Sequence, residues 1–471
     1  INPLTNSSAI YVRGYSKFWE ITGNSVYEQT TVVPTGDMAY HGILIGYSAT
    51  ATAQLYGFNI TGNYIGGTAP LCGGTKLTKT NTKNNDFVGI ETFVGPNSAT
   101  IIDDNVISNI TWENSSNATF TGISALRGKV YIGSTNGNVI GAVSGTNAIS
   151  FKSGGTTNST LYGVYINQYD SVFCRKNIIS ALTSQSSNSL YANSIYGIFK
   201  QINVTGYLEV SNNQIGGDDT NSIVATSLAS SNKQIVSGIW ISGTGNNFID
   251  NNVIRNLTNS TTSTTVSVNG CVNGITVTAG TCNIANNSIS ILRISNKNTG
   301  INALSSVIGI SAYGTTAAKT ITANTILNLL NDNTTFAGSV VGILFLGSTG
   351  TNTVEKNFIS DLRVNAATTA ANVFGLRIMS GNTTYSNNII SLGGNTKTNI
   401  YGLYISCAVN NNSYVYNNSI SIYGTVAAST NKSYAIYSAT NTNIRNFRNN
   451  IFSNIRSTTS GTNLHYAIYL N

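Results

Sequence analysis

One short phrase recurs along the chain and constrains its fold more than any other feature. It reads apolar residue, two spacers, Asn, one spacer and apolar residue, as in Ile249-Asp-Asn-Asn252-Val-Ile254 and Val354-Glu-Lys-Asn357-Phe-Ile359. Repetition of one motif at a regular interval is the sequence signature of a solenoid. We identify eleven copies, whose central residues are Asn105, Asn138, Asn177, Asn213, Asn252, Asn287, Asn324, Asn357, Asn388, Asn418 and Asn450.

A second marker, Gly followed by an apolar–variable–apolar triplet, precedes each Asn. Gly238-Ile-Trp-Ile241 is an example, and the markers Gly309, Gly342 and Gly375 lie 33 residues apart. The triplet alternates with the period of a β-strand, and its Ile, Val and Thr residues favour pleated sheets. Each repeat is therefore expected to form one coil with two or three short strands.

The predicted fold class is all-β, a right-handed parallel β-helix (solenoid) of about a dozen coils. Parallel crossovers are almost always right-handed, which sets the expected hand. At a bend between two strands, an Asn amide can satisfy backbone groups that have no ladder partner. Because neighbouring strands lie about 4.8 Å apart, amides of successive coils can also bond to one another. The eleven Asn residues are therefore predicted to form a structural ladder.

Two regions are expected along the chain. Residues 1–38 fit the repeat poorly and are predicted to be an N-terminal cap or an irregular first coil. Residues 39–471 are predicted to be the parallel β-helix, which ends in mid-repeat. A solenoid needs its last edge protected. Other copies or further domains are therefore expected to stack on the C-terminal coil.

Composition excludes several classes of function. Only 8% of the residues are charged, against roughly 25% in ordinary globular proteins. The net charge of +8 is not gathered into the dense Lys/Arg stripe of a nucleic-acid binder. No apolar run approaches the ~20 residues that span a bilayer. The chain is therefore expected neither to bind nucleic acid nor to span a membrane.

The metal-binding residue types are also sparse. Sixteen acidic residues are too few for carboxylate-rich calcium sites. The five cysteines show no CxxC spacing, which argues against zinc. Cys271 and Cys282 flank one predicted strand, so they form either a disulfide or two free thiols. No metal and no cofactor are predicted.

The middle residue of each Gly triplet should point away from the core, and these residues form an outward column. The column is expected to begin with Leu44, Asn59 and Glu91. Exposed Tyr and Trp side chains favour partly wet contacts with sugars or proteins. Loops folded over this face would instead make the aromatic residues part of the core. The predicted binding or interface residues are Tyr165, Phe199, Trp240, Tyr404, Tyr437 and Tyr469.

These features together resemble two known classes of protein. The Ile-x-x-Asn-x-Ile coil, the Gly-Ile-x-Ile strand and the Asn/Thr-rich loops are similar to those of secreted β-helix repeat proteins of Bacteroidetes type. That resemblance implies an extracellular or cell-surface location. It also implies a structural or adhesive function, as a surface stalk, adhesin segment or filament subunit. The aromatic column adds glycans to the expected partners. More distantly, the chain resembles the pectate-lyase-like β-helix superfamily, including its Asn ladder.

The second resemblance implies an alternative function, that of a polysaccharide lyase or glycoside hydrolase. The Gly-His-Gly segment of polygalacturonase-like enzymes is missing, and the only histidines are His41 and His465. The Arg-Ile-Lys segment of these enzymes is missing as well. Hydrolysis needs a carboxylic acid and a carboxylate base, and a lyase needs a base with a neutralising cation. The candidate catalytic group consists of Glu91, Asp103, Asp104, Arg127 and Lys129. The other interpretation of these residues is an ion-paired surface.

Overall fold

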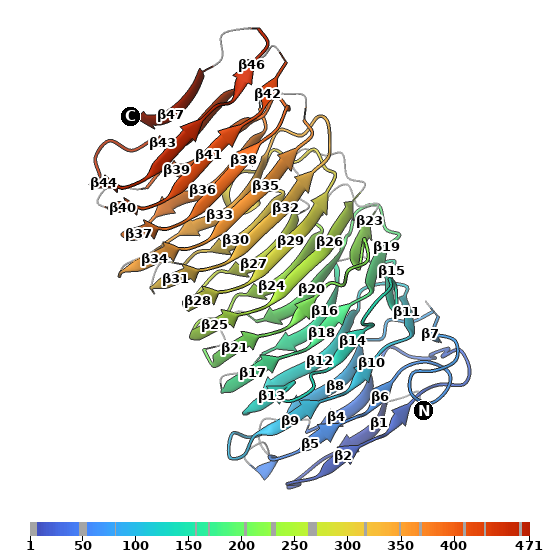
Figure 1. Ribbon diagram of the computed structural model, residues 1–471. Coiled ribbons are helices and arrows are strands. Elements are labelled where there is room, and N and C mark those ends of the chain that lie inside the picture. Colours follow the sequence, from blue (N-terminus) through green and yellow to red (C-terminus); the bar gives the residue numbers. More distant parts are fainter. Residues whose placement is uncertain are drawn as a thin grey trace. The chain divides into compact units, whose positions relative to one another are not determined.

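The chain forms a parallel β-helix, as seen in a computed structural model (Figure 1). Two compact units are present, and each is a stack of coils: unit 1 comprises residues 1–248 and 256–262, and unit 2 comprises residues 249–255 and 263–471. A short 3₁₀ turn lies at Asn302–Leu304. The structure describes residues 7–46, 54–80, 82–155, 158–167, 170–201, 205–227, 232–261, 271–314, 318–347, 350–366, 370–407, 411–427, 430–460 and 464–471.

The coils of unit 1 contribute strands to three parallel sheets. Sheet 1 consists of β1 (Ser7–Val12), β4 (Tyr40–Ile45), β8 (Phe87–Phe93), β12 (Thr119–Arg127), β16 (Ser159–Ile166), β20 (Asn193–Lys200) and β24 (Ile235–Ile241). Sheet 2 contains β2 (Glu20–Thr22), β5 (Asn59–Thr61), β9 (Thr100–Asp103), β13 (Val130–Ile132), β17 (Ser171–Arg175) and β21 (Tyr207–Ser211). Sheet 3 contains β3 (Ser25–Val26), β6 (Tyr64–Ile65), β7 (Leu77–Lys79), β10 (Val106–Ile107), β11 (Ile110–Asn114), β14 (Val139–Gly141), β15 (Ile149–Ser153), β18 (Ile178–Ser180), β19 (Leu182–Ser186), β22 (Gln214–Ile215) and β23 (Ile223–Ser227).

Unit 2 repeats this arrangement, while β25 (Asn246–Asp250) and β26 (Val253–Thr261) hold residues of both units. Sheet 1 of unit 2 consists of β27 (Cys271–Val277), β30 (Val307–Ala312), β33 (Ser339–Leu346), β36 (Asn372–Ser380), β39 (Asn399–Ile405), β43 (Lys432–Ser438) and β47 (Leu464–Leu470). Sheet 2 contains β28 (Thr281–Ala285), β31 (Lys319–Thr322), β34 (Asn352–Glu355), β37 (Thr383–Ser386), β40 (Ser413–Tyr416) and β44 (Arg445–Arg448). Sheet 3 contains β29 (Ser288–Ile294), β32 (Thr325–Asn331), β35 (Phe358–Val364), β38 (Ile389–Gly393), β41 (Ser419–Tyr423) and β45 (Ile451–Asn454), and a further pair is β42 (Thr425–Val426) with β46 (Ser457–Thr458).

The marker Gly residues lie where neighbouring coils come closest. A Cβ on Gly342 would lie 2.6 Å from the carbonyl oxygen of Gly375 and 2.7 Å from Cγ2 of the core residue Ile359. The same short contact recurs at the other markers of sheet 1, such as Gly89 and Gly163. Glycine is therefore selected here for close backbone approach.

The predicted Asn ladder is confirmed in both units. In unit 1 each rung is an Nδ2–H donated to the Oδ1 of the Asn in the next coil, at 2.8–2.9 Å from Asn105 to Asn138 to Asn177 to Asn213. In unit 2 the rungs measure 2.9–3.0 Å from Asn252 through Asn287, Asn324, Asn357, Asn388 and Asn418 to Asn450. The same Oδ1 also accepts a backbone N–H, as Asn138 Oδ1 does from Asn105 at 3.1 Å.

The residue before each ladder Asn makes the bend possible. It has a positive φ, for example 58° at Asp104, 57° at Asn212 and 55° at Asn286. Asn and Gly tolerate this conformation better than other residues, and they occupy most of these positions. The bend turns the ladder Asn inward, where its amide replaces the backbone bonds that the turn interrupts.

The described part of residues 1–38 is itself a coil. Strand β1 pairs with β4, β2 with β5 and β3 with β6, all in parallel. The ladder extends into this coil, since Asn24 Nδ2 donates to Asn63 Oδ1 at 2.8 Å and Asn63 Nδ2 donates to Asn105 Oδ1 at 2.9 Å. Two ladder residues, Asn24 and Asn63, therefore precede the eleven Asn residues identified in the sequence.

The interior of the coils is apolar, with a few buried cations. Ile123, Ile239 and Ile343 are fully buried, as the strand pattern requires. Lys200 is 1% exposed, and its ammonium donates to Gly206 O at 2.7 Å, Thr244 O at 3.0 Å and Asn247 Oδ1 at 3.0 Å. Burial lowers the pKa of Lys200 to about 8.

The five cysteines are free thiols in the structure. Cys271 and Cys282 are both buried, so the free-thiol alternative holds for this pair. Burial raises the pKa of Cys282 to about 12, which keeps its thiol protonated.

Candidate functional site

The outward face of sheet 1 carries two files of side chains, where the sequence indicated one column. The upstream file consists of the residues that directly precede the marker Gly positions. The downstream file consists of the middle residues of the triplets that follow them. The register pairs Tyr401 with Tyr434 in the upstream file and Tyr404 with Tyr437 in the downstream file. Asn59 was wrongly placed in this column: it lies in β5 of sheet 2, and Leu44 pairs directly with Glu91.

In unit 2 both files become continuous ladders of aromatic rings over the last coils. Tyr401, Tyr434 and Tyr466 stack in the upstream file, with ring centroids 5.2 and 5.5 Å apart. The downstream file repeats this with Tyr404, Tyr437 and Tyr469, at 5.1 Å for both steps. Rings of opposite files meet edge to face, as Tyr434 and Tyr437 do at 4.9 Å and 71°.

This arrangement covers the ring faces. A ring inside either file has a parallel ring in the coil before it and another in the coil after it, so its edge is the part that faces outward. Arg377 covers the first rings, with its guanidinium carbon 4.4 Å from the centroid of Phe374 and 5.2 Å from that of Tyr404. Burial, together with neighbouring tyrosines, raises the pKa of Tyr434 to about 12. The main role of the aromatic files in unit 2 is therefore packing between neighbouring coils.

In unit 1 the aromatic files are shorter. Tyr162 stacks on Tyr196 at 5.7 Å, and Tyr165 stacks on Phe199 at 6.0 Å. Trp240 continues beyond them, in edge contact with Tyr196 at 5.8 Å. Towards β12, however, both files stop, because the register places Thr121 beside Tyr162 and Ser124 beside Tyr165. These two small side chains leave space over the terminal rings.

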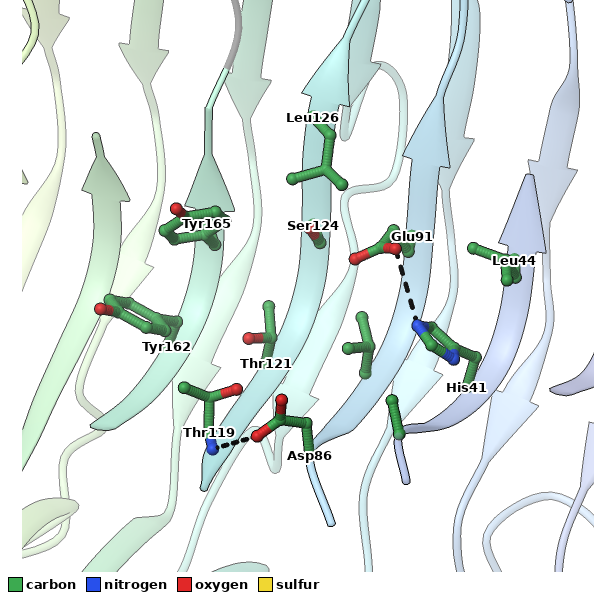
Figure 2. A pocket seen from close by; sticks show the side chains of 12 residues that line it. His41, Leu44, Asp86, Glu91, Thr119, Thr121, Ser124, Leu126, Tyr162 and Tyr165 are labelled. Atoms are coloured by element: carbon green, nitrogen blue, oxygen red, sulfur yellow. Dashed lines mark hydrogen bonds and ion pairs between the residues drawn. The ribbon is translucent and has the colours of Figure 1, made fainter. Parts of the chain in front are cut away.

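That space is a groove of about 380 Å³ on the outward face of β4, β8, β12 and β16 (Figure 2). The tyrosine pair closes it on one side, and His41 and Leu44 of β4 close it on the other. Glu91 and Ser124 lie between them in Figure 2. The lining residues are Ala39, His41, Leu44, Asp86, Val88, Glu91, Thr119, Thr121, Ser124, Leu126, Tyr162 and Tyr165.

The polar groups of the groove are held in place by the strands beneath them. His41 Nε2 lies 3.6 Å from Glu91 Oε1, and the two side chains are 6% and 20% exposed. Asp86 Oδ1 accepts the backbone N–H of Thr119 at 2.6 Å, which fixes this carboxylate at the rim. Burial, and then the nearby charges of Tyr162 and Glu91, raises the pKa of Tyr165. Its phenol therefore remains a neutral hydrogen-bonding group.

The proposed catalytic group does not come together around one cavity. Glu91 lines the groove, whereas Asp103 ends β9 in sheet 2. Asp103 is 6% exposed, and its carboxylate accepts the backbone N–H groups of residues 134–137 at 2.8–3.3 Å. Burial favours the protonated acid, but these bonds outweigh it and lower the pKa of Asp103. A carboxylate held this way organises a turn.

The other three members of that group lie outside the groove. Asp104 is exposed at the positive-φ bend before the ladder Asn. Arg127 is the last residue of β12 and follows Leu126 at the groove's edge. The ammonium of Lys129 lies 5.8 Å from the ring centroid of Tyr131. Catalysis by these residues stays a prediction.

The upstream file and His41 were missed from the sequence. The signal was present, because an aromatic residue directly precedes the marker position in Tyr162-Gly163, Tyr196-Gly197, Phe374-Gly375 and Tyr401-Gly402. Asn24 and Asn63 also carried a readable signal, since Ile21-Thr-Gly-Asn24-Ser-Val26 and Ile60-Thr-Gly-Asn63-Tyr-Ile65 repeat the ladder phrase.

Comparison with known proteins gave no matching family model, no matching curated protein and no matching solved structure. Over the described residues, no group of three His, Cys, Asp or Glu side chains is arranged to hold a metal ion. The same part of the chain contains no helix with the length and apolar character needed to cross a bilayer.

Proposed function

We propose that this chain is an extracellular, adhesive β-helix whose coils form a rigid scaffold and whose groove in unit 1 binds a glycan. The observation that carries the proposal is the end of the aromatic files beside Thr121 and Ser124. It leaves the faces of Tyr162 and Tyr165 turned towards an open groove. Sugar rings stack on such aromatic faces, and polar groups at the rim bond to the ring hydroxyls.

The size and chemistry of the groove support this assignment. Its volume of about 380 Å³ lies in the range of roughly 300–1,000 Å³ typical of small-molecule sites. Thr119, Asp86 and Glu91 add a hydroxyl and two carboxylates beside the rings. The scaffold role is supported by the ladder, which gives both units the same regular hydrogen-bonded backbone.

The location outside the cell is supported by composition and by resemblance. Asn, Ser and Thr replace charged residues as the source of solubility, as in the secreted β-helix repeat proteins that the coil resembles. Antibody labelling of intact source cells tests this part. Signal from intact cells is expected, and signal that appears only after lysis would contradict it.

The binding function is tested by extending the aromatic files across the groove. The double variant Thr121→Tyr with Ser124→Phe places rings where the small side chains now lie, so we expect at least about a tenfold loss of glycan affinity. The matched control is Asn273→Tyr with Thr276→Phe, which changes the same two coil positions in β27 of unit 2. Affinities are measured on an array of neutral, acidic and amino hexasaccharides, with circular dichroism as the check on folding.

Two results would overturn this function. One is a folded chain that retains no saccharide on the array, and the other is full affinity in the double variant of the groove. An equal loss of affinity in the control variant would place binding away from the groove and would also overturn the proposed function.

A second candidate function, glycoside hydrolysis, is favoured by one observation: Asp86 and Glu91 line the same groove. Two carboxyl groups across a bound sugar are the minimum for acid–base cleavage. A lyase is less well supported, because none of the lining residues is Lys or Arg. Release of reducing ends that disappears in Glu91→Gln would establish hydrolysis, and saccharide bound without release would leave adhesion.

A further inference from the structure

The groove of unit 1 differs in charge from the chain that carries it. The whole sequence has a net charge of +8, whereas the charged lining residues of the groove are Asp86 and Glu91. Coulomb repulsion between like charges disfavours a uronate or a sulfated sugar there. The same two carboxylates attract a cation. Such a lining is expected to favour a cationic ligand over an anionic one.

His41 helps to position Glu91 in the groove. Its side chain is 6% exposed, and its Nε2 is directed to Glu91. The other ring nitrogen, Nδ1, is buried and has no hydrogen-bond partner in the described structure. Buried polar atoms nearly always have a partner, because leaving one unpaired costs free energy. Nδ1 is too deeply buried for a ligand in the groove to reach, so His41 contributes to the site through the Nε2 that faces Glu91.

The neighbouring rings and hydroxyls narrow the ligand further. The faces of Tyr162 and Tyr165 can stack against a sugar ring and also attract a cation through their π-systems. Thr119, Thr121 and Ser124 line the floor between the rings and Glu91. A flexible lysine side chain would use the carboxylates but has no ring to stack on the flat tyrosine faces. A cationic sugar uses both.

We propose that this groove recognises an amino sugar, with the ammonium paired to Glu91 and Asp86 and the sugar ring against Tyr162 or Tyr165. The inference rests on the proposed function, since it names the class of glycan that the same groove binds. It predicts preference for deacetylated over acetylated chains, because acetylation removes the positive charge.

The test is calorimetric titration of the full chain with four probes: a β-1,4-glucosamine hexamer, its N-acetylated counterpart, a hexagalacturonate and hexalysine. We expect the glucosamine hexamer to bind at least about tenfold more tightly than the acetylated hexamer. Glu91→Gln and Asp86→Asn should each weaken it by about tenfold, as for a charge-assisted bond. His41→Phe removes the ring nitrogen that faces Glu91 and should weaken it by about fivefold.

Glu113→Gln is the matched control, because Glu113 pairs with Lys152 in β15 and lies outside the groove. Its affinity for the glucosamine hexamer should equal that of the unchanged chain. Equal binding of the acetylated hexamer, or tighter binding of hexagalacturonate, would overturn the amino-sugar assignment and leave glycan adhesion standing. Tight hexalysine binding without glucosamine binding would replace the sugar with a basic peptide. Failure of all saccharides would sink both proposals.

Discussion

Sheet 1 shows the same two outward files in both units, yet the files end differently. In unit 2 the rings run from Phe374 and Tyr404 to Tyr466 and Tyr469, each ring stacked on the next. In unit 1 they stop at Tyr162 and Tyr165, beside Thr121 and Ser124. The first arrangement covers ring faces, and the second exposes them. The residue in the adjacent coil therefore decides whether a tyrosine face is covered by another ring or left open to the groove.

The comparison assumes that the scaffolds of the two units are equivalent, and this can be tested first. Asn138 and Asn357 make the same four side-chain bonds, two donated and two accepted. Asn138→Leu in unit 1 and Asn357→Leu in unit 2 each leave buried groups unpaired. We therefore expect each variant to lower the unfolding free energy of its own unit by about 4 kcal/mol. Urea unfolding followed by hydrogen exchange measures the loss unit by unit. A clear loss in one variant without a comparable loss in the other would show that the two scaffolds are not equivalent.

The second prediction separates packing tyrosines from the groove tyrosines. Tyr437 contacts four rings, namely Tyr401, Tyr404, Tyr434 and Tyr469, whereas Tyr165 contacts Tyr162 and Phe199. At about 1 kcal/mol per ring pair, Tyr437→Ala should destabilise by roughly 2 kcal/mol more than Tyr165→Ala. Glycan affinity should fall only in Tyr165→Ala. The reverse pattern, measured by urea unfolding and titration, would contradict the distinction between the two faces.

The smallest expected effect concerns the interior beneath the groove-bearing face. Burial holds the pKa of Lys200 at about 8, below its ordinary value of 10.5. Between these two values the unfolded chain binds more protons, so the unfolding free energy rises with pH in this window; below pH 8 the cost of the buried charge is fully present. We expect this contribution to be about 1 kcal/mol between pH 8 and pH 9.

The measurement is the difference in unfolding free energy between the unchanged chain and Lys200→Met as a function of pH. A difference is needed because the buried thiols change stability in the opposite direction above pH 9, and they do so in both chains. Cys174, whose pKa is raised to about 12 by burial, is one of them. The exposed Lys432 provides the control as Lys432→Met. A pH-independent difference for Lys200→Met would mean that this ammonium is not buried as described.

Much of the fold could be predicted because the repeat is written into the chain at every coil. Asn252, Asn287 and Asn324 are separated by loops of different length, yet the phrase around them is unchanged. That constancy fixes the bend, the inward strand residues and the ladder at once. Asn24 and Asn63 carry the same phrase and were missed; for Asn24, the aromatic residues of the first 38 positions favoured a cap.

The candidate site was harder to predict, for a physical reason. His41 and Tyr162 are far apart in sequence and meet only through the register of β4, β8, β12 and β16. A groove produced by small residues such as Thr121 has no motif of its own. Asp103 shows the converse: an acidic pair looks catalytic in sequence, but its backbone partners lie in a turn more than 30 positions later. Contacts between coils have to be known before either role is visible.

The ladder also bears on how a chain of this kind can diversify. Its rungs join residues 42 positions apart between Asn63 and Asn105, but only 30 apart between Asn388 and Asn418. The rung length is 2.9 Å in both cases. Insertions and deletions are thus absorbed by the loops without disturbing the register of the sheets. Such a chain can exchange whole loops between coils, by mutation or by engineering, and acquire new surfaces while its backbone plan is inherited unchanged.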